Sequence, residues 1–383
     1  MIDGTDRILA ASLINGHTHA AMAILRGRGG DLPLDRWLQE VIWPLERELS
    51  GEDIYWGTRL ACIEMARNGV SKFWDMYWHS AEVARAVRDA GLRAVAGPVI
   101  LSLPDGPDPA AAEASLIEDL DRITEMGPMV EAAIAPHAIY TVGPDRLSGL
   151  AALAEDRGLP IHIHLSETEK EVLDCISEHG LRPAFYLDRL GLLGPGTVLA
   201  HGVWLDEDEL GLIAERGATI VTNPVANDKL AVGRTFPLPD AVEAGIPLGL
   251  GTDGPASNDS LDPLSDLKVL GLVQRGAARD AAVLKSGDAW RIATGQASPL
   301  LRPEPPLEPG SPADFILLDA KAPELATGDL TSNLVYAASG AVVDSLVVDG
   351  RAVSLHREVA DFDEIIARVS EIDERLGRAS GPT

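Results

Sequence analysis

Five side chains of types that bind metal ions stand at or beside the ends of short apolar segments. ASLINGHTH carries His17 and His19, LPIHIHLSE carries His164, TVLAH ends at His201 and IPLGLGTD ends at Asp253. Each segment has the length and composition of a buried β-strand. Because the carboxyl ends of parallel strands meet at one face of a barrel, these side chains are expected to converge. Three or four nitrogen and oxygen ligands with one open position would form a catalytic metal site.

The spacing of the histidines separates ligands from core residues. His17 and His19 are two positions apart on a strand, so both imidazoles point to one face and can bind one ion. His162 and His164 have the same spacing, and His164 is the better ligand because it lies nearer the strand end. We expect His162 one layer deeper, behind the ligands. A single strand histidine is more often a core residue than a ligand, so the prediction depends on the whole set.

Two carboxylates are candidates for acid–base chemistry. Glu167 follows His164 by three residues and is placed to reach a metal-bound water without binding the ion. Its alternative role is an acid in the first turn of the helix that SETEKE begins. Asp253 can bind the ion and accept a proton from its water, whose pKa the metal lowers toward neutrality. The set therefore predicts metal-dependent hydrolysis.

Residues 11–302 alternate between strand and helix patterns. GEDIYWGTRLACIEMARNG, SAEVARAVRDAG and PAAAEASLIEDLDRITEM are examples of the expected helices. The expected strands are ASLINGHTH, VSKFWDMY, RAVAGPVIL, MVEAAIAPH, LPIHIHLSE, TVLAHG, ATIVTNP and IPLGLGTDG. Eight strands that alternate with helices predict an α/β protein with a (β/α)8 barrel of the TIM type, rather than a doubly wound sheet.

A different pattern begins after residue 302. The connector LRPEPPLEPGSPAD is rich in proline, and DFILLD and DSLVVDGRAV follow as short β segments, the second with an Asp-Gly turn. We expect residues 303–355 and 1–10 to form a small β-sandwich that is shortened at its N-terminal end. Residues 356–383 are expected to form a C-terminal helix, whose amphipathic pattern is the run FDEIIARVSEIDERLGR.

The composition limits the partners and the location of the protein. The chain has 59 acidic and 32 basic residues, and its net charge of −27 repels nucleic acid and anionic lipid. No apolar run reaches the roughly eighteen residues of a membrane span, and the first residues do not resemble a signal peptide. Cys62 and Cys175 fit a reducing compartment. We expect a cytoplasmic protein that acts on a small molecule without a nucleic-acid or membrane partner; assembly into a homo-oligomer is left open.

Five motifs, in their order along the chain, resemble the amidohydrolase superfamily. They are NGHTHAAMAILRG, IHLSETEKE, LAHGVWL, NPVANDKLAVG and GTDGPASNDSLD. They are most similar to the branch that contains 5-methylthioadenosine/S-adenosylhomocysteine deaminases and s-triazine chlorohydrolases. The resemblance covers about residues 10–355 and implies a (β/α)8 barrel with one divalent metal ion. Relatives with two ions bridge them with a fourth-strand lysine, and EAAIAPH contains none.

The resemblance also implies a role for each site residue. The implied metal ligands are His17, His19, His164 and Asp253, and the residues around the hydrolytic water are Glu167, His201 and again Asp253. The ion expected is zinc, although iron, manganese or cobalt suit the same ligands. Trp37 corresponds to a tryptophan beside the nucleoside, Glu46 to an acid on the ribose hydroxyls, and His137 to a substrate contact near the metal, with Glu167 also touching the substrate. On the residues alone, Trp37 could be a packing anchor and Glu46 an acid on a surface helix.

The expected reaction is deamination of an adenine nucleoside such as 5′-methylthioadenosine, 5′-deoxyadenosine or adenosine. In this reaction Asp253 takes a proton from water, Glu167 protonates the ring nitrogen beside the carbon under attack, and ammonia leaves. The alternatives are an s-triazine chlorohydrolase or aminohydrolase, a deaminase of a free base such as guanine or a pterin, and a non-catalytic barrel. Glu46 favours a nucleoside because a free base has no ribose, and the complete ligand set argues against a non-catalytic protein.

S-adenosylhomocysteine is the less favoured substrate. Relatives that bind its amino-acid tail carry arginines between the third and fourth strands, whereas residues 97–120 contain no basic residue. The acids of this segment are Asp105, Asp108, Glu113, Glu118 and Asp119. A buried carboxylate without a cationic partner is costly, so neutral or cationic 5′ substituents are expected.

Overall fold

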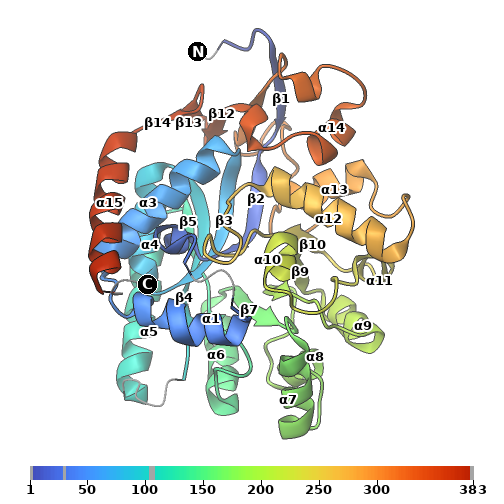
Figure 1. Cartoon of the computed structure of the whole chain (residues 1–383). Helices are drawn as coiled ribbons and strands as arrows, with labels where there is room; N and C mark the ends of the chain where they lie inside the picture. The colour runs from blue at the N-terminus through green and yellow to red at the C-terminus, as the bar shows by residue number, and fades with distance from the viewer. Residues whose placement is uncertain (1–2, 29–31, 103–107, 380–383) are drawn as a thin grey trace.

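The parallel strands of the chain form two sheets in the computed structural model, which describes residues 3–28, 32–102 and 108–379 (Figure 1). One sheet has the order β2-β3-β4-β5, with β6 beside β4, and the other has the order β10-β9-β8-β7. The bounds are β2 (Leu13–Thr18), β3 (Val70–Tyr77), β4 (Arg93–Ile100), β5 (Val130–Ala132), β6 (Ala135–Pro136), β7 (Ile161–Leu165), β8 (Thr197–His201), β9 (Thr219–Thr222) and β10 (Leu248–Leu250). Each of the eight expected segments contains a strand, and the fourth is divided into β5 and β6.

The two sheets meet at two places where the strand pairing is reduced. On one side, a single parallel bridge joins Ile134 to Ile161. On the other, the Asn15 side chain bonds both the N–H and the hydroxyl of Thr252, at 3.0 and 2.7 Å, in place of a backbone ladder between β2 and β10. The α/β class and the parallel sheets that the sequence predicted are confirmed, and the described ladders form two sheets rather than one continuous ring.

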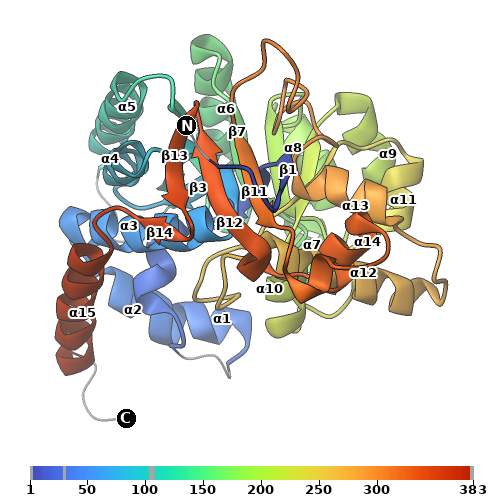
Figure 2. The same ribbon diagram turned by 90° about the horizontal axis from the view of Figure 1, so that it is seen from above.

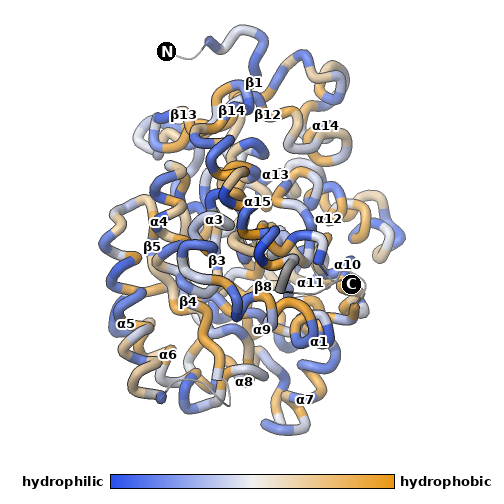
Figure 3. The backbone as a smooth tube through the Cα atoms, turned by 60° about the vertical axis from the view of Figure 1, so that its left-hand side comes forward, coloured by the Kyte–Doolittle hydropathy of each residue, from blue (hydrophilic) through white to orange (hydrophobic). Residues whose placement is uncertain are grey.

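Helices follow the strands and lie outside both sheets (Figure 1). They are α3 (Gly51–Arg67), α4 (Ser80–Ala90), α5 (Pro109–Glu125), α6 (Pro144–Arg157), α7 (Glu169–His179), α8 (Pro183–Arg189), α9 (Glu207–Arg216), α10 (Pro224–Lys229), α11 (Leu238–Glu243), α12 (Pro263–Ala278) and α13 (Ser286–Ala293). Hydrophobic and hydrophilic residues alternate along them, which is typical of helices with one face on a core (Figure 3). Ser50 and Asp53 form a capping box at the start of α3, and Gly158 ends α6 with a φ of 63°.

A five-stranded antiparallel sheet lies beside the parallel sheets (Figure 2). Its order is β1 (Arg7–Ala11), β11 (Phe315–Asp319), β12 (Val343–Val348), β13 (Arg351–Leu355) and β14 (Glu358–Val359). The first and last parts of the chain therefore share one sheet, with Leu9 opposite Leu317. The predicted Asp-Gly turn joins β12 to β13, where Asp349 and Gly350 have φ values of 52° and 73°. The predicted sandwich needs a second facing sheet, which the described residues of this region do not form, so it stays a prediction.

The amphipathic run FDEIIARVSEIDERLGR forms the last helix, α15 (Phe362–Ala379), and the helix begins at the first residue of that run, as predicted. The preceding part of residues 356–383 is not helical, because Glu358 and Val359 form β14 and pair with β13. α15 packs on α3, and an ion pair of 3.0 Å joins Asp361 to Arg59. Within the described residues, no helix combines the length and apolar character required to cross a membrane.

Candidate active site

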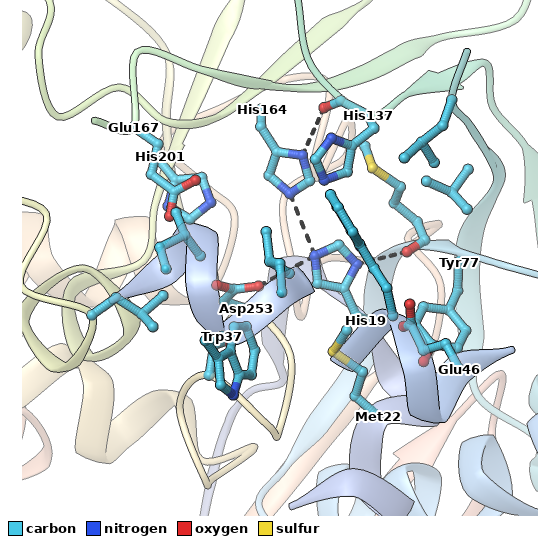
Figure 4. Close-up of a pocket in the computed structure, with 18 of the residues that line it drawn as sticks. His19, Met22, Trp37, Glu46, Tyr77, His137, His164, Glu167, His201 and Asp253 are labelled. Atoms are coloured by element: carbon cyan, nitrogen blue, oxygen red, sulfur yellow. Dashed lines mark hydrogen bonds and ion pairs between the residues drawn. The ribbon is translucent and has the colours of Figure 1, made fainter. Parts of the chain in front are cut away.

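The predicted metal ligands all lie at or beside the carboxyl ends of parallel strands. Figure 4 shows the side chains of His19, His164 and Asp253 facing one another. His17 lies near the end of β2, with His19 just beyond that strand, while His164 belongs to β7 and His201 ends β8. Asp253 follows β10, and its N–H donates to the His17 carbonyl at 3.0 Å. The convergence expected from the strand pattern is therefore present.

The backbone at these strand ends is strained. His201 and Asp253 have φ values of 74° and 63°, in the left-handed region that residues with a Cβ rarely adopt. Such conformations cluster at functional sites because the surrounding structure enforces them. Gly251 has a different purpose: a Cβ there would lie 2.9 Å from the Cβ of His17, so only glycine lets β10 approach β2 this closely.

The ligand atoms have the spacing of a metal site. His19 Nε2 lies 3.3 Å from Asp253 Oδ1 and 3.4 Å from His164 Nε2, and His17 Nε2 lies 3.5 Å from Asp253 Oδ1. Tetrahedral ligands about 2.1 Å from a zinc ion would be roughly 3.4 Å apart. His17 Nε2 is fully buried and has no hydrogen-bond partner among the described residues. A buried nitrogen without a hydrogen-bond partner is what a metal ligand requires, so these residues suit a divalent ion.

The other ring nitrogen of each histidine is held by the protein. The contacts are His17 Nδ1 with His162 Nε2 at 2.8 Å, His19 Nδ1 with the Met76 carbonyl at 2.6 Å, His164 Nδ1 with the His137 carbonyl at 2.7 Å, and His201 Nδ1 with Asn227 Oδ1 at 2.8 Å. A carbonyl acceptor requires a protonated Nδ1, which leaves the Nε2 lone pair free to face the centre. His162 lies behind His17, one layer deeper, as its strand position predicted.

Burial and charge set the protonation of these groups. Burial lowers the pKa of His17 to about 4 and the pKa of His164 well below its usual value, so both imidazoles are neutral at pH 7. Burial acts to raise the pKa of Asp253, but its contact with His17 and its electrostatic interactions with the neighbouring histidines outweigh this and lower it. Neutral imidazoles and an ionised carboxylate are the forms that bind metals.

Glu167 lies beside the ligand group rather than in it. Its side chain is buried, and its Oε1 is 3.8 Å from His201 Nδ1. Burial raises the pKa of Glu167, and the charge of Asp253 acts in the same direction. A carboxyl group that keeps its proton closer to neutral pH is suited to general acid catalysis. The interpretation as a mere first-turn acid does not fit, because α7 begins after Glu167 and the side chain faces the cavity (Figure 4).

A cavity opens over the ligand group, with walls that suit a planar heterocycle. Its aromatic and aliphatic lining includes Met22, Trp37, Trp43, Tyr77, Trp78 and Tyr140. Most of its polar groups are the strand-end residues of the ligand group, and Glu46 adds a carboxylate from α2. Polar groups that converge within an aromatic lining are typical of a small-molecule site. Stacking on aromatic rings would hold a flat ring system above the ligands.

The three predicted substrate contacts all line this cavity. Trp37 is also a packing anchor, being 3 % exposed with its indole N–H donating to the Arg28 carbonyl at 3.0 Å. Glu46 is not a surface acid: it accepts from Trp78 Nε1 at 3.2 Å, and burial raises its pKa. His137 packs its ring against His164, with centroids 4.8 Å apart.

Trp37 and Glu46 lie in a segment whose helical structure was not predicted. Residues 34–46 form α1 (Leu34–Trp37), a π-helical turn (Leu38–Ile42) and α2 (Trp43–Glu46). These pieces are too short to show a helical period, so only the resemblance to the amidohydrolase superfamily pointed to the two residues. Asn227 and Glu171 were not predicted as site residues, although Asn227 lies within the motif NPVANDKLAVG.

A second cavity of 280 Å³ adjoins the first and shares Trp43, Glu46 and Trp78 with it. Arg47 and His79 also line it. Arg47 is exposed and forms no ion pair within the part of the chain that the structure describes. A cation is therefore present near the site, although none lies in residues 97–120.

Comparisons with known proteins agree with this site. The amidohydrolase family matches residues 8–353. The chain is 40% identical over 383 residues to 5′-deoxyadenosine deaminase of Methanoregula boonei, covering 99% of this chain and 86% of that protein. It is 40% identical over 368 residues to 5-methylthioadenosine/S-adenosylhomocysteine deaminase of Pyrococcus furiosus, covering 95% and 87%. An adenosine deaminase from Xanthomonas campestris, crystallised with bound zinc, has a TM-score of 0.92 and 33% identity, covering 97% and 86%. This chain belongs to the amidohydrolase family.

Proposed function

We propose that this protein is a metal-dependent aminohydrolase that deaminates an adenine nucleoside and releases ammonia. The observation that carries the proposal is one cavity that holds the convergent ligands, the buried acid Glu167 and, on its aromatic wall, the carboxylate of Glu46. Two relatives at 40% identity are named as deaminases of 5′-deoxyadenosine and of 5-methylthioadenosine or S-adenosylhomocysteine. The favoured substrates are 5′-methylthioadenosine, 5′-deoxyadenosine and adenosine.

The metal site takes one divalent ion, which we propose is zinc. His17, His19, His164 and Asp253 would hold it, since their Nε2 and carboxylate atoms converge. A bound divalent ion lowers the pKa of water and stabilises the negative charge that develops during hydrolysis. The zinc in the crystal structure of the Xanthomonas campestris adenosine deaminase supports this choice of ion.

Two carboxylates divide the proton transfers. Asp253 is ionised at neutral pH because its pKa is lowered, so it accepts a proton from the attacking water. Glu167 retains its proton to higher pH and delivers it to the ring nitrogen beside the carbon under attack, which makes that carbon more electrophilic. His201 orients the water. A proton then passes to the exocyclic amine, which leaves as ammonia while the ring carbon keeps the water oxygen.

The cavity wall would hold the rest of the nucleoside. Glu46 accepts hydrogen bonds from the ribose hydroxyls, Trp37 packs beside the nucleoside, and His137 contacts the ring near the metal. All three line the same cavity as Glu167. Glu46 disfavours the alternative of an s-triazine or free-base hydrolase, because its partly buried carboxylate would then face a ligand with no hydroxyl to bind it.

The two parallel sheets would together make one (β/α)8 barrel over residues 11–302. The strand order, the Ile134–Ile161 bridge and the Asn15–Thr252 contacts support this proposal. Residues 1–10 and 303–355 would belong to the small β-domain. Action in the cytoplasm and assembly into a homo-oligomer remain predictions.

The test is ammonia release from a panel of compounds by zinc-loaded protein. The panel contains adenosine, 5′-methylthioadenosine, 5′-deoxyadenosine, S-adenosylhomocysteine, guanine and a chlorotriazine. We expect the neutral adenine nucleosides to be the best substrates. If only guanine or the chlorotriazine reacts, the alternative function is correct; if nothing reacts, the proposal fails.

A further inference from the structure

The carboxylate of Glu171 binds two consecutive backbone N–H groups beside the ligand His164. Its Oε1 accepts from Ser166 N at 2.8 Å, and its Oε2 accepts from Glu167 N at 2.8 Å. Glu171 is 4 % exposed, and Glu167 is 6 % exposed. Both oxygens of one buried side chain are thus occupied by the loop that carries the proposed catalytic acid.

The contact differs from ordinary helix capping. Thr168 is the N-cap of α7, and its hydroxyl accepts from the N–H of Glu171 at 3.2 Å. In a capping box the side chain at the position of Glu171 would return to the N–H of Thr168. Here it reaches past the cap to the two residues before it, so its carboxylate serves the loop between β7 and α7 rather than the helix end.

The loop needs to be held because its backbone is strained. Ser166 has a φ of 49°, in the left-handed region that serine rarely adopts. Its N–H is bound by Glu171, and its carbonyl accepts from Trp204 N at 2.8 Å. Contacts from both sides fix this peptide, and strain of this kind persists only where the surroundings impose it.

We propose that Glu171 is the positioning residue of the catalytic acid. By holding the N–H groups of Ser166 and Glu167 to the rigid first turn of α7, it directs the Glu167 side chain into the cavity, 3.8 Å from His201. It does not line the catalytic cavity and acts only through the loop. The catalytic part of this inference rests on the proposed function, whereas the structural part can be measured without it.

The test is Glu171→Gln in the zinc-loaded full chain. A glutamine keeps the volume, but its amide nitrogen cannot accept the second N–H. We expect kcat for 5′-deoxyadenosine to fall by about 10- to 100-fold, since small misplacements of catalytic groups have effects of this size. KM should stay within about twofold and the metal content at one ion per chain, because substrate binding and the ligands are not altered. Amide hydrogen exchange at Ser166 and Glu167 should accelerate.

Glu209→Gln is the matched control. Glu209 is also buried at the third position of a helix, accepts the N–H of Ala184 at 3.0 Å and forms a capping box with Asp206, but it lies in α9, away from the cavity. It should lower the thermal midpoint without a change in kcat per metal-loaded molecule. Should Glu171→Gln prevent folding, Glu171→Asp, which keeps the charge but shortens the reach, is measured in the same way.

Unchanged exchange at Ser166 and Glu167, or a kcat per metal-loaded molecule that equals that of wild type, would overturn the proposal. A fall in kcat equal to that of Glu209→Gln would do the same. If wild-type protein deaminates no nucleoside but exchange still accelerates in Glu171→Gln, the proposed function fails while the loop contact stands.

Discussion

At the scale of single residues, the environment gives similar side chains different tasks. Glu167 and Asp253 are both buried carboxylates, yet the pKa of Glu167 is raised and that of Asp253 is lowered. The difference follows from their neighbours: Asp253 lies among histidines, whereas burial dominates around Glu167. Opposite shifts in one cavity are what a proton acceptor and a proton donor need.

Replacement of Glu167 by glutamine tests the donor role. Glu167→Gln should retain the metal and reduce kcat about 100-fold or more, because a proton transfer to the ring nitrogen is lost. Ammonia release and elemental analysis measure the two quantities. Glu169→Gln removes a neighbouring acid from the first turn of α7 and should leave kcat unchanged. Near wild-type turnover in the Glu167 variant would mean that the acid is not used.

Metal content tests the ligand set. One divalent ion per chain is expected, since the described ligand atoms gather around one centre and the fourth-strand segment contains no lysine. His164→Ala should lose both the ion and the activity, and a chelator should inactivate the wild-type protein, with zinc restoring it. Two tightly held ions per active chain, measured by elemental analysis, would contradict this prediction.

At the scale of elements, short helical pieces complete the site that the strands begin. α1 and α2 are four residues each, and they bring Trp37 and Glu46 to the cavity. The strand ends supply the ligands and the acid, whereas this segment supplies the wall (Figure 4). Substitutions in this segment should therefore change the substrate preference, whereas substitutions at the strand ends should change the rate of the chemical step.

Glu46→Gln tests this division. Because a hydrogen bond to a charged group contributes about 1.5–3 kcal/mol, kcat/KM for 5′-deoxyadenosine should fall by about 10-fold or more. The same substitution should have little effect on 2′,3′-dideoxyadenosine, which lacks the hydroxyls that Glu46 would bind. An equal loss for both nucleosides would show that Glu46 supports the fold and not the ribose.

Asp266 of α12 gives a pH-dependent prediction for stability. It is buried and accepts from Asn258 Nδ2 at 2.9 Å, and burial raises its pKa well above the usual value. Below the pKa of this carboxyl group in the unfolded chain, about 4, Asp266 is protonated in both the folded and the unfolded state. As the pH rises, Asp266 ionises first in the unfolded chain. It therefore lowers the free energy of unfolding progressively until the pH passes its pKa in the folded state.

Asp266→Asn removes this titration. The free energy of unfolding of the variant, relative to wild type, should therefore increase from about pH 4 upward, as measured by denaturant midpoints at several pH values. The exposed Asp240→Asn in α11 controls for the loss of one negative charge. A difference between variant and wild type that is constant with pH would refute the assignment of a raised pKa.

At the scale of the whole molecule, charge bears on the choice of substrate. A net charge of −27 repels anionic groups at low salt. The described part of residues 97–120 contains the acids Asp108, Glu113, Glu118 and Asp119, while Asp105 lies outside the described residues. Arg146, across from this segment, already pairs with Glu113. Arg47, which lines the adjoining cavity, is a cation without an ion pair among the described residues.

We therefore predict that neutral 5′ substituents are preferred. 5′-Methylthioadenosine, 5′-deoxyadenosine or adenosine should exceed S-adenosylhomocysteine in kcat/KM by about tenfold, which corresponds to roughly 1.4 kcal/mol. Measurements at low and high salt separate the long-range charge effect. S-adenosylhomocysteine as the best substrate would contradict the prediction, and Arg47→Met would then identify whether Arg47 binds its carboxylate.

Features that depend on a few neighbouring residues could be predicted from the sequence. Apolar runs that end at or beside His19, His164 and Asp253 predicted both strands and metal ligands, because a strand has a period of two and parallel strands end at one face. The alternation with helices predicted the parallel sheets for the same reason. The sequence predicted residues 356–361 less well, since β14 forms there by pairing with β13, a contact that no local pattern indicates.

Contacts between residues far apart in the chain could not be predicted, because they form only when the strands and helices pack together. His17 contacts His162 across 145 residues, and Asn15 bonds Thr252 across 237, and no local period encodes such pairs. The position of Glu46 in the cavity and the reach of Glu171 past its own helix cap are likewise products of packing. The residue types along the strands therefore indicate which side chains can bind the metal ion. The protonation and orientation of these side chains depend on burial and on partners that only folding brings together.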